Sequence, residues 1–284
     1  MIRPLPLDLQ HAVFQIALSL IATILYCIAG AMVAYRLLGR YRHGEPTALP
    51  RYLPLMLAGA AAAIHGALIY ADLFTPEGLN LGFFNALSLA AWLIAALMVL
   101  LALRFPIDNL GAVLMPTAAL ALVLHQWMPP NARPIAVSHP IQIHIVLSIL
   151  AYGILTLAAV QAGLLSIQES RLRRRRLGSL IRVLPPMARM ETLLFQLIGI
   201  GLTLLTLSLL SGLLFLDDLF AQHLAHKTVL SCAAWLVFAG LLWGRRQQGW
   251  RGRRAIRWTL WGFAFLAAAY FGSKFVLELV LLRQ

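Results

Sequence analysis

Charged residues are scarce in this sequence: they make up 12% of its 284 residues, while 61% are hydrophobic. Soluble domains average about 25% charged residues. Apolar runs of about 20 residues, long enough to cross a hydrocarbon core of roughly 30 Å, recur along the whole chain. The longest polar stretch, about 169–189, is too short to bury a core of its own. The composition therefore excludes a soluble protein and predicts an integral membrane protein.

Cysteine is almost absent as well. Cys27 and Cys232 both lie within apolar runs, and no C-x-x-C pair occurs. This excludes thiol–disulfide chemistry and covalent c-type haem attachment to this chain, and we expect both thiols to be small buried core residues. No nucleophile and base stand at a spacing suited to side-chain catalysis, so the sequence gives no reason to assign an enzyme.

The apolar runs are continuous and do not alternate, which favours helices over a β-barrel. We predict a single transmembrane domain over residues 1–284, an all-α polytopic membrane bundle of about eight helices. The predicted helices are 10–37, 51–70, 84–104, 109–127, 140–168, 190–215, 226–244 and 255–282.

Positive charge alternates between the connections. The odd-numbered connections carry 18 of the 23 lysines and arginines, so the positive-inside rule places them in the cytoplasm and both termini outside. We expect a multi-pass protein of the bacterial inner (plasma) membrane. The net charge of +13 comes from arginines that flank helices, which favours membrane lipid, including the anionic inner leaflet, over nucleic acid as a partner.

Histidines gather on the opposite side. One of the eight, His43, falls in a cytoplasmic loop, and the other seven fall in the outer half or outer loops. A proton relay would spread ionisable groups through the membrane depth, and carboxylates for a zinc or calcium cage are scarce outside. A flat apolar cofactor with one or two axial imidazoles fits better, and the sequence therefore predicts haem of the b type. The outward histidines are His11, His65, His125, His139, His144, His223 and His226.

Two histidines are predicted to ligate the haem iron. His144 begins a polar stripe with Ser148, Tyr152 and Thr156. Spacing of four residues puts these side chains on one helix face, which should point into the bundle because polar groups facing lipid are costly. His226 lies in the first turn of the helix predicted over 226–244. The alternative for both histidines is that each caps a helix or hydrogen-bonds a neighbouring helix.

His65 and His139 are further candidates for cofactor binding. His139 precedes Pro140, and we expect it to belong to the loop. His65 lies in "LAGAAAAIHGA", a stretch of small residues that lets other helices approach closely. An interhelical hydrogen bond is therefore the alternative for His65.

Three segments resemble a known family. "IHIVLSILAYGIL", "HKTVLSCAAWLVFAGLLWGR" and "GWRGRRAIRWTLWGFAFLAAAYFGSKFVLE" resemble helices of the cytochrome c assembly superfamily, the haem-handling membrane proteins of the CcsA, CcmC and HemX type. The resemblance covers residues 140–280 best. It implies a haem-handling bundle with the cofactor near the outer face, and His144 matches the outer-face histidine that ligates haem iron in that family.

The chain also departs from the family pattern. The tryptophan-rich outer loop is replaced by "FLDDLFAQHLAHK", Trp243 stands where synthetases carry an inner histidine, and no histidine follows the last helix. We therefore expect an accessory or regulatory haem-binding protein of the cytochrome c assembly type, not a full synthetase. The alternative is a cofactor-free membrane subunit or regulator that acts by binding another membrane protein. A transporter ranks last because broken mid-membrane helices are not evident.

Overall fold

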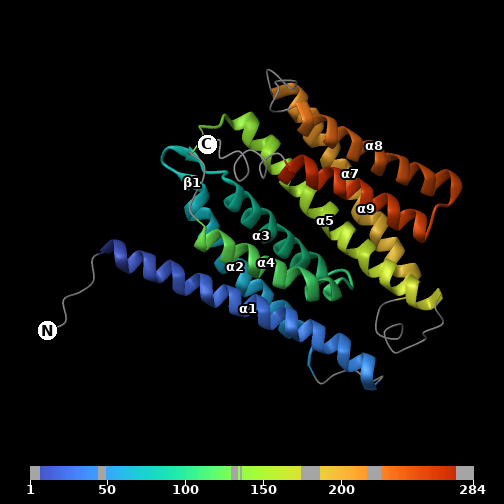
Figure 1. The fold of residues 1–284 in the computed structure, drawn as a ribbon, viewed down its shortest axis with the longest axis horizontal. Helices are drawn as coiled ribbons and strands as arrows, with labels where there is room; N and C mark the ends of the chain where they lie inside the picture. The colour runs from blue at the N-terminus through green and yellow to red at the C-terminus, as the bar shows by residue number, and fades with distance from the viewer. Residues whose placement is uncertain are drawn as a thin grey trace. The chain divides into compact units, whose positions relative to one another are not determined.

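The computed structural model describes residues 7–43, 49–128, 134, 136–173, 186–215 and 225–272. Helices dominate it (Figure 1), and each predicted helix has a counterpart that begins within a few residues of the predicted start. The helices are α1 (Leu7–His43), α2 (Tyr52–Leu73), α3 (Phe83–Ala102), α4 (Gly111–Trp127), α5 (His139–Arg173), α7 (Met187–Phe215), α8 (Ala225–Gln248) and α9 (Arg253–Ala267).

Within the described residues, seven helices are long and apolar enough to cross a membrane. They are all of the helices above except α9. The last predicted helix, 255–282, begins as α9 and continues as the π-helix η2 (Ala268–Gly272), and residues beyond 272 lie outside the described part. The prediction of an all-α polytopic membrane bundle is confirmed, while the orientation of the termini stays a prediction.

A short hairpin that the sequence analysis missed follows α2. Strands β1 (Phe74–Thr75) and β2 (Gly78–Leu79) pair antiparallel. The Thr75 hydroxyl donates a hydrogen bond of 2.8 Å to the Gly78 carbonyl. The turn sequence Thr-Pro-Glu-Gly puts proline and glycine at the second and fourth positions, where β-turns favour them. The connection from α2 to α3 is thus held by strand pairing and by the Thr75 hydrogen bond.

The chain divides into two compact units, and the first comprises residues 1–35 and 48–135. In it α3 packs against α2 and α4. Ala22 of α1 joins Leu68 and Leu122 in a buried apolar cluster. Gly30 allows α1 to approach α4, because a Cβ there would lie 2.9 Å from the Pro116 ring. Small residues therefore bring the helices of this unit together.

The second unit comprises residues 36–47 and 136–284. Helix α5 lies along α7, and α9 packs against both α5 and α8 (Figure 1). Gly201 of α7 leaves room for Leu155, since a Cβ would lie 2.6 Å from that side chain. The Trp235 indole of α8 donates a hydrogen bond of 2.8 Å to the Thr206 hydroxyl of α7.

The two cysteines correct one expectation. Cys27 and Cys232 are both exposed and not buried. In α1, Cys27 lies among the exposed apolar side chains of Ile24 and Ile28. In a membrane protein an exposed apolar face contacts lipid, so an apolar run alone does not distinguish lipid contact from core. The single-domain prediction over 1–284 stays a prediction.

Candidate functional site

His144 lies in the second turn of α5 and faces α7. Its Nδ1 atom is 3.0 Å from the backbone oxygen of Ser208 and 3.0 Å from the Ser211 hydroxyl. A carbonyl oxygen only accepts hydrogen bonds, so Nδ1 is the donor and carries the ring hydrogen. In the neutral ring, Nε2 then has a lone pair. The contact with α7 thus fixes the tautomer that can coordinate a metal through Nε2.

Among the described residues, the Nε2 atom of His144 has one weak protein contact, 3.4 Å from the Ser148 hydroxyl. That hydroxyl lies 2.7 Å from the His144 carbonyl, to which it donates, and 2.7 Å from the Ser208 hydroxyl. Because the Ser148 hydroxyl donates its hydrogen to this carbonyl, it does not donate it to Nε2 of His144. Gly212 leaves space for the ring, because a Cβ there would lie 3.0 Å from its Cε1 atom.

This arrangement fits an axial ligand of haem. Metal-bound histidines usually donate their other ring N–H to a carboxylate, a backbone carbonyl or water, which orients the ring and raises the basicity of the ligating nitrogen. His144 has this arrangement through the Ser208 carbonyl. Its side chain is half-buried. The hydrogen bonding of His144, and not its residue type alone, therefore matches that of a metal-bound histidine.

The polar stripe on α5 faces protein, as predicted. Ser148 contacts α7, and the Tyr152 ring packs against three aromatic rings of α9 and η2. Its centroid is 5.7 Å from that of Phe263, 5.2 Å from Tyr270 and 5.5 Å from Phe271. The last two lie on the π-helix η2, and π-helical turns are frequent at functional sites. An aromatic cluster thus lies two turns along α5 from His144, on the same face.

The other two predicted outer-face ligands are not joined to His144. His226 is exposed in the first turn of α8, and no hydrogen bond, ion pair or ring contact links it to His144 within the described residues. His139 is the exposed first residue of α5 and does not belong to the loop. Pro140 follows it in the first helical turn, where proline is tolerated. The roles of both histidines as ligands stay predictions.

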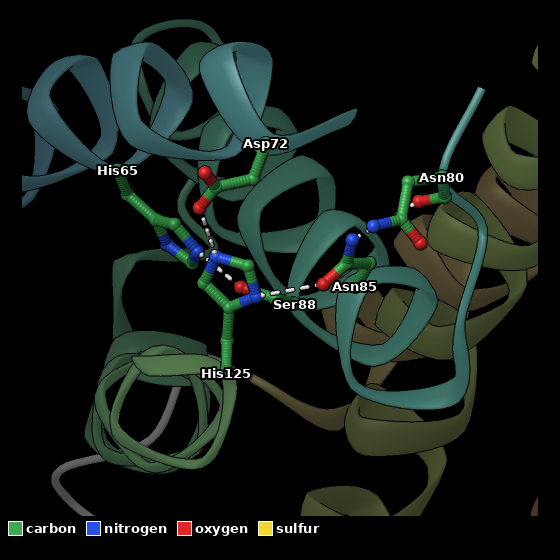
Figure 2. Close-up of polar contacts among 6 residues, drawn as sticks. All are labelled: His65, Asp72, Asn80, Asn85, Ser88 and His125. Atoms are coloured by element: carbon green, nitrogen blue, oxygen red, sulfur yellow. Dashed lines mark hydrogen bonds and ion pairs between the residues drawn. The ribbon is translucent and has the colours of Figure 1, made fainter. Parts of the chain in front are cut away.

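His65 of α2 is fully buried and contacts both α1 and α3, and Figure 2 shows its contact with Ser88. Its Nε2 atom is 2.8 Å from the Ser88 hydroxyl of α3, and its Nδ1 atom is 3.4 Å from the Tyr26 hydroxyl of α1. The Tyr26 ring also stands edge-on to the imidazole at 5.9 Å. Both ring nitrogens face protein hydroxyls, which favours the alternative of an interhelical hydrogen bond. The role of His65 as a ligand stays a prediction.

A second imidazole in the same unit forms a cluster that the sequence analysis missed. The Nε2 atom of His125 in α4 lies 2.9 Å from the Asp72 carboxyl of α2, and Nδ1 lies 3.0 Å from the Asn85 amide oxygen of α3. The Asn85 amide nitrogen donates to the Asn80 carbonyl at 3.1 Å. Figure 2 shows the rings of His65 and His125 in one cluster between these helices. Asp72 is 42% exposed and His125 only 5%.

The hydrogen positions in this cluster follow from its geometry. The Asn85 amide nitrogen donates to the Asn80 carbonyl, so the Asn85 amide oxygen faces His125. Because an amide oxygen only accepts hydrogen bonds, the Nδ1 atom of His125 must be the donor. Nε2 faces the Asp72 carboxyl, and one further hydrogen lies between them, on the imidazole or on the carboxyl. Protein groups therefore occupy both ring nitrogens of His125. No pattern in the sequence pairs Asp72 with His125, because they lie on different helices.

The described residues contain no group of three or more histidine, cysteine, aspartate or glutamate side chains that could hold a metal ion. A single imidazole such as His144, which suits an axial position on haem, does not depend on such a cage.

Comparisons with known proteins identify the family of the chain. The profile of the family described as Cytochrome C assembly protein matches residues 54–281. The chain is 31% identical over 269 residues to the inner membrane protein YpjD of Escherichia coli (strain K12), which covers 92% of this chain and 98% of the relative. No solved structure matches the chain.

Two further relatives match shorter stretches. An uncharacterized 28.8 kDa protein of Azospirillum brasilense is 34% identical over 208 residues, which are 69% of this chain and 77% of that protein. The cytochrome c biogenesis protein CcsA of Heterosigma akashiwo (strain NIES-293 / 8280G21-1) is 31% identical over 84 residues, which are 29% of this chain and 26% of that protein. Because the family profile spans most of the sequence and YpjD aligns over nearly all of it, the chain belongs to the cytochrome c assembly protein family.

Proposed function

We propose that this protein is a haem-binding protein of the bacterial inner membrane with an accessory or regulatory role in cytochrome c assembly. Nε2 of His144 is the proposed axial ligand of a b-type haem. The observation that carries the proposal is the hydrogen bond from His144 Nδ1 to the Ser208 carbonyl, because it leaves Nε2 as the coordinating atom. The family membership and the similarity to a CcsA protein support haem as the cofactor.

Haem would supply an iron centre that binds axial imidazole. The residues of this chain would bind and orient it. Ser208 and Ser211 of α7 hold the His144 ring by its Nδ1 atom. The Ser148 and Ser208 hydroxyls form a hydrogen bond of 2.7 Å, which joins α5 to α7 beside His144. The His144 imidazole is therefore held between two helices, and its Nε2 atom would be the one that binds haem iron.

His226 is the proposed second ligand. It follows the outer connection between α7 and α8, and it is exposed and without a hydrogen-bond partner in the described part of the chain. A histidine whose ring nitrogens are not engaged is available to a cofactor that binds at the predicted outer face. His139, exposed at the start of α5, is the competing candidate.

The test is the absorption spectrum of the full-length protein purified in detergent after expression with ample haem. We expect a stoichiometric b-type spectrum in the wild type, in the oxidised and reduced states. His144→Ala should lose or shift it, while Ile143→Ala, at a neighbouring side chain that is 55% exposed, should keep it. Because alanine leaves a gap, added imidazole should restore the spectrum of His144→Ala if the variant is folded.

The histidine variants also separate the candidates for the second ligand. His226→Ala should convert a six-coordinate spectrum to a five-coordinate one, and His139→Ala should leave it unchanged. A wild-type protein that is folded, colourless and unable to take up added haem would refute the proposal. That outcome would favour the cofactor-free subunit that binds another membrane protein.

A further inference from the structure

The turn between α8 and α9 is held by carboxylates from two other helices. Gly249 and Gly252 both have positive φ, +64° and +53°, so the chain reverses tightly here. The Gly252 N–H donates a hydrogen bond of 2.6 Å to the Glu191 carboxylate of α7. The guanidinium of Arg253 lies 3.5 Å from the Glu169 carboxylate of α5. The turn is thus fixed to the bundle from two sides.

An indole ring forms the centre of this turn. The Trp250 ring packs on the Trp258 ring at 4.9 Å and fills the space beside Gly244, where a Cβ would overlap the indole. The guanidinium of Arg254 lies 4.9 Å over the Trp250 ring, within the range of a cation–π interaction. Arg245 donates to the Trp250 carbonyl at 3.2 Å. The Trp250 indole is therefore held in position, and the Arg254 guanidinium lies over its face.

Four arginines around this turn have no carboxylate partner among the residues that the structure describes. Residues 245–257 contain six arginines. Arg245 is committed to the Trp250 carbonyl and the Phe195 ring, and Arg253 to Glu169. The other four are exposed, and in the described part of the chain none of them forms an ion pair. We call these four the arginine patch: Arg246, Arg251, Arg254 and Arg257.

Exposed apolar side chains begin one helical turn from the arginine patch. Trp243, 59% exposed, lies three residues before Arg246 on α8. Trp261, 63% exposed, lies four residues after Arg257 on α9. Residues three or four apart share a helix face. Each of these two helices thus presents a cation and, one turn deeper, a large apolar side chain.

We propose that the α8–α9 turn binds an anionic phospholipid, with the arginine patch on its phosphate headgroup and Trp243 and Trp261 beside its acyl chains. Guanidinium groups form paired hydrogen bonds with phosphate oxygens, and basic sites at the ends of membrane helices bind anionic headgroups. Four cations without carboxylate partners supply the charge complementarity. Free phosphate would use the arginines but gains nothing from the two tryptophans, so the arrangement favours the lipid.

The experiment uses the full-length protein in a neutral detergent. Phosphatidylglycerol, phosphatidylcholine or inorganic phosphate is added, and the melting temperature and the bound lipid are measured, the latter by native mass spectrometry. We expect phosphatidylglycerol alone to raise the melting temperature and to remain bound. The triple variant Arg251→Gln, Arg254→Gln, Arg257→Gln should bind it at least about tenfold more weakly, since one charged hydrogen bond contributes about 1.5–3 kcal/mol.

Two further variants separate a lipid site from arginines that only set topology. Arg104→Gln removes an exposed arginine of another predicted cytoplasmic connection and should leave lipid binding unchanged. Arg254→Lys keeps the charge that topology needs but loses the planar group over Trp250, and should weaken binding. Equal binding of phosphatidylglycerol by the wild type and the triple variant would overturn the proposal. So would equal stabilisation by phosphatidylcholine or by inorganic phosphate.

Discussion

The His125 cluster offers a direct test of the hydrogen-bond geometry. His125→Leu removes an imidazole that is 5% exposed and leaves an apolar side chain of similar reach in its place. The buried Asn85 amide oxygen then loses its donor, because its amide nitrogen is committed to the Asn80 carbonyl. Asp72 loses its partner as well, but at 42% exposure water can replace it. The cost should therefore come mainly from Asn85.

The magnitude follows from burial. An unsatisfied buried amide oxygen costs about 1–3 kcal/mol, and a half-exposed ion pair contributes at most about 1 kcal/mol. His125→Leu should thus lower the free energy of unfolding by about 1–4 kcal/mol, most of it from the Asn85 amide oxygen. Asn85→Leu removes the same hydrogen bond from the other side. The double variant should cost less than the two single variants together, by about 1 kcal/mol, within the range measured between membrane helices.

The assay is reversible unfolding in mixed micelles, in which a denaturing detergent is titrated against a mild one and helicity is followed. Asp72→Asn provides the matched control. An amide can still donate to Nε2 of His125, so this variant should cost under about 1 kcal/mol. Strict additivity of His125→Leu and Asn85→Leu would refute the inferred hydrogen bond, and a large loss in Asp72→Asn would show that charge and not hydrogen bonding holds the cluster.

Two further predictions concern glycines that face a ring. Gly212→Val should abolish the haem spectrum without removing a ligand, since its Cβ would lie 3.0 Å from Cε1 of His144; an unchanged spectrum would mean that the ring need not lie against α7. Gly262→Ala should destabilise the protein by about 1–3 kcal/mol, because its Cβ would lie 2.8 Å from the Phe238 ring. Gly199→Ala, with nothing within 4 Å, should be neutral or stabilising by up to about 1 kcal/mol in thermal unfolding; equal effects at both positions would contradict this reasoning.

The sequence predicted the helices and one face of α5, because both depend on local pattern. The lengths of the apolar runs predicted where each helix begins to within a few residues. Four-residue spacing placed His144, Ser148 and Tyr152 on one face, which the structure confirms. The pairing of His125 with Asp72 could not be predicted in this way. It depends on the rotation of two separate helices about their axes, and hydropathy carries no information about that rotation.

The predicted outward position of seven histidines can be examined through the partners of each described ring. An imidazole can ligate a metal when one nitrogen is anchored and the other is available. His65 and His125 have protein partners at both nitrogens, from helices within one unit, so they act there as polar cross-links between helices. His144 is anchored at Nδ1 and has only a 3.4 Å contact at Nε2. His65 and His125 thus cross-link helices, and His144, the proposed ligand, differs from them in the occupancy of its second nitrogen.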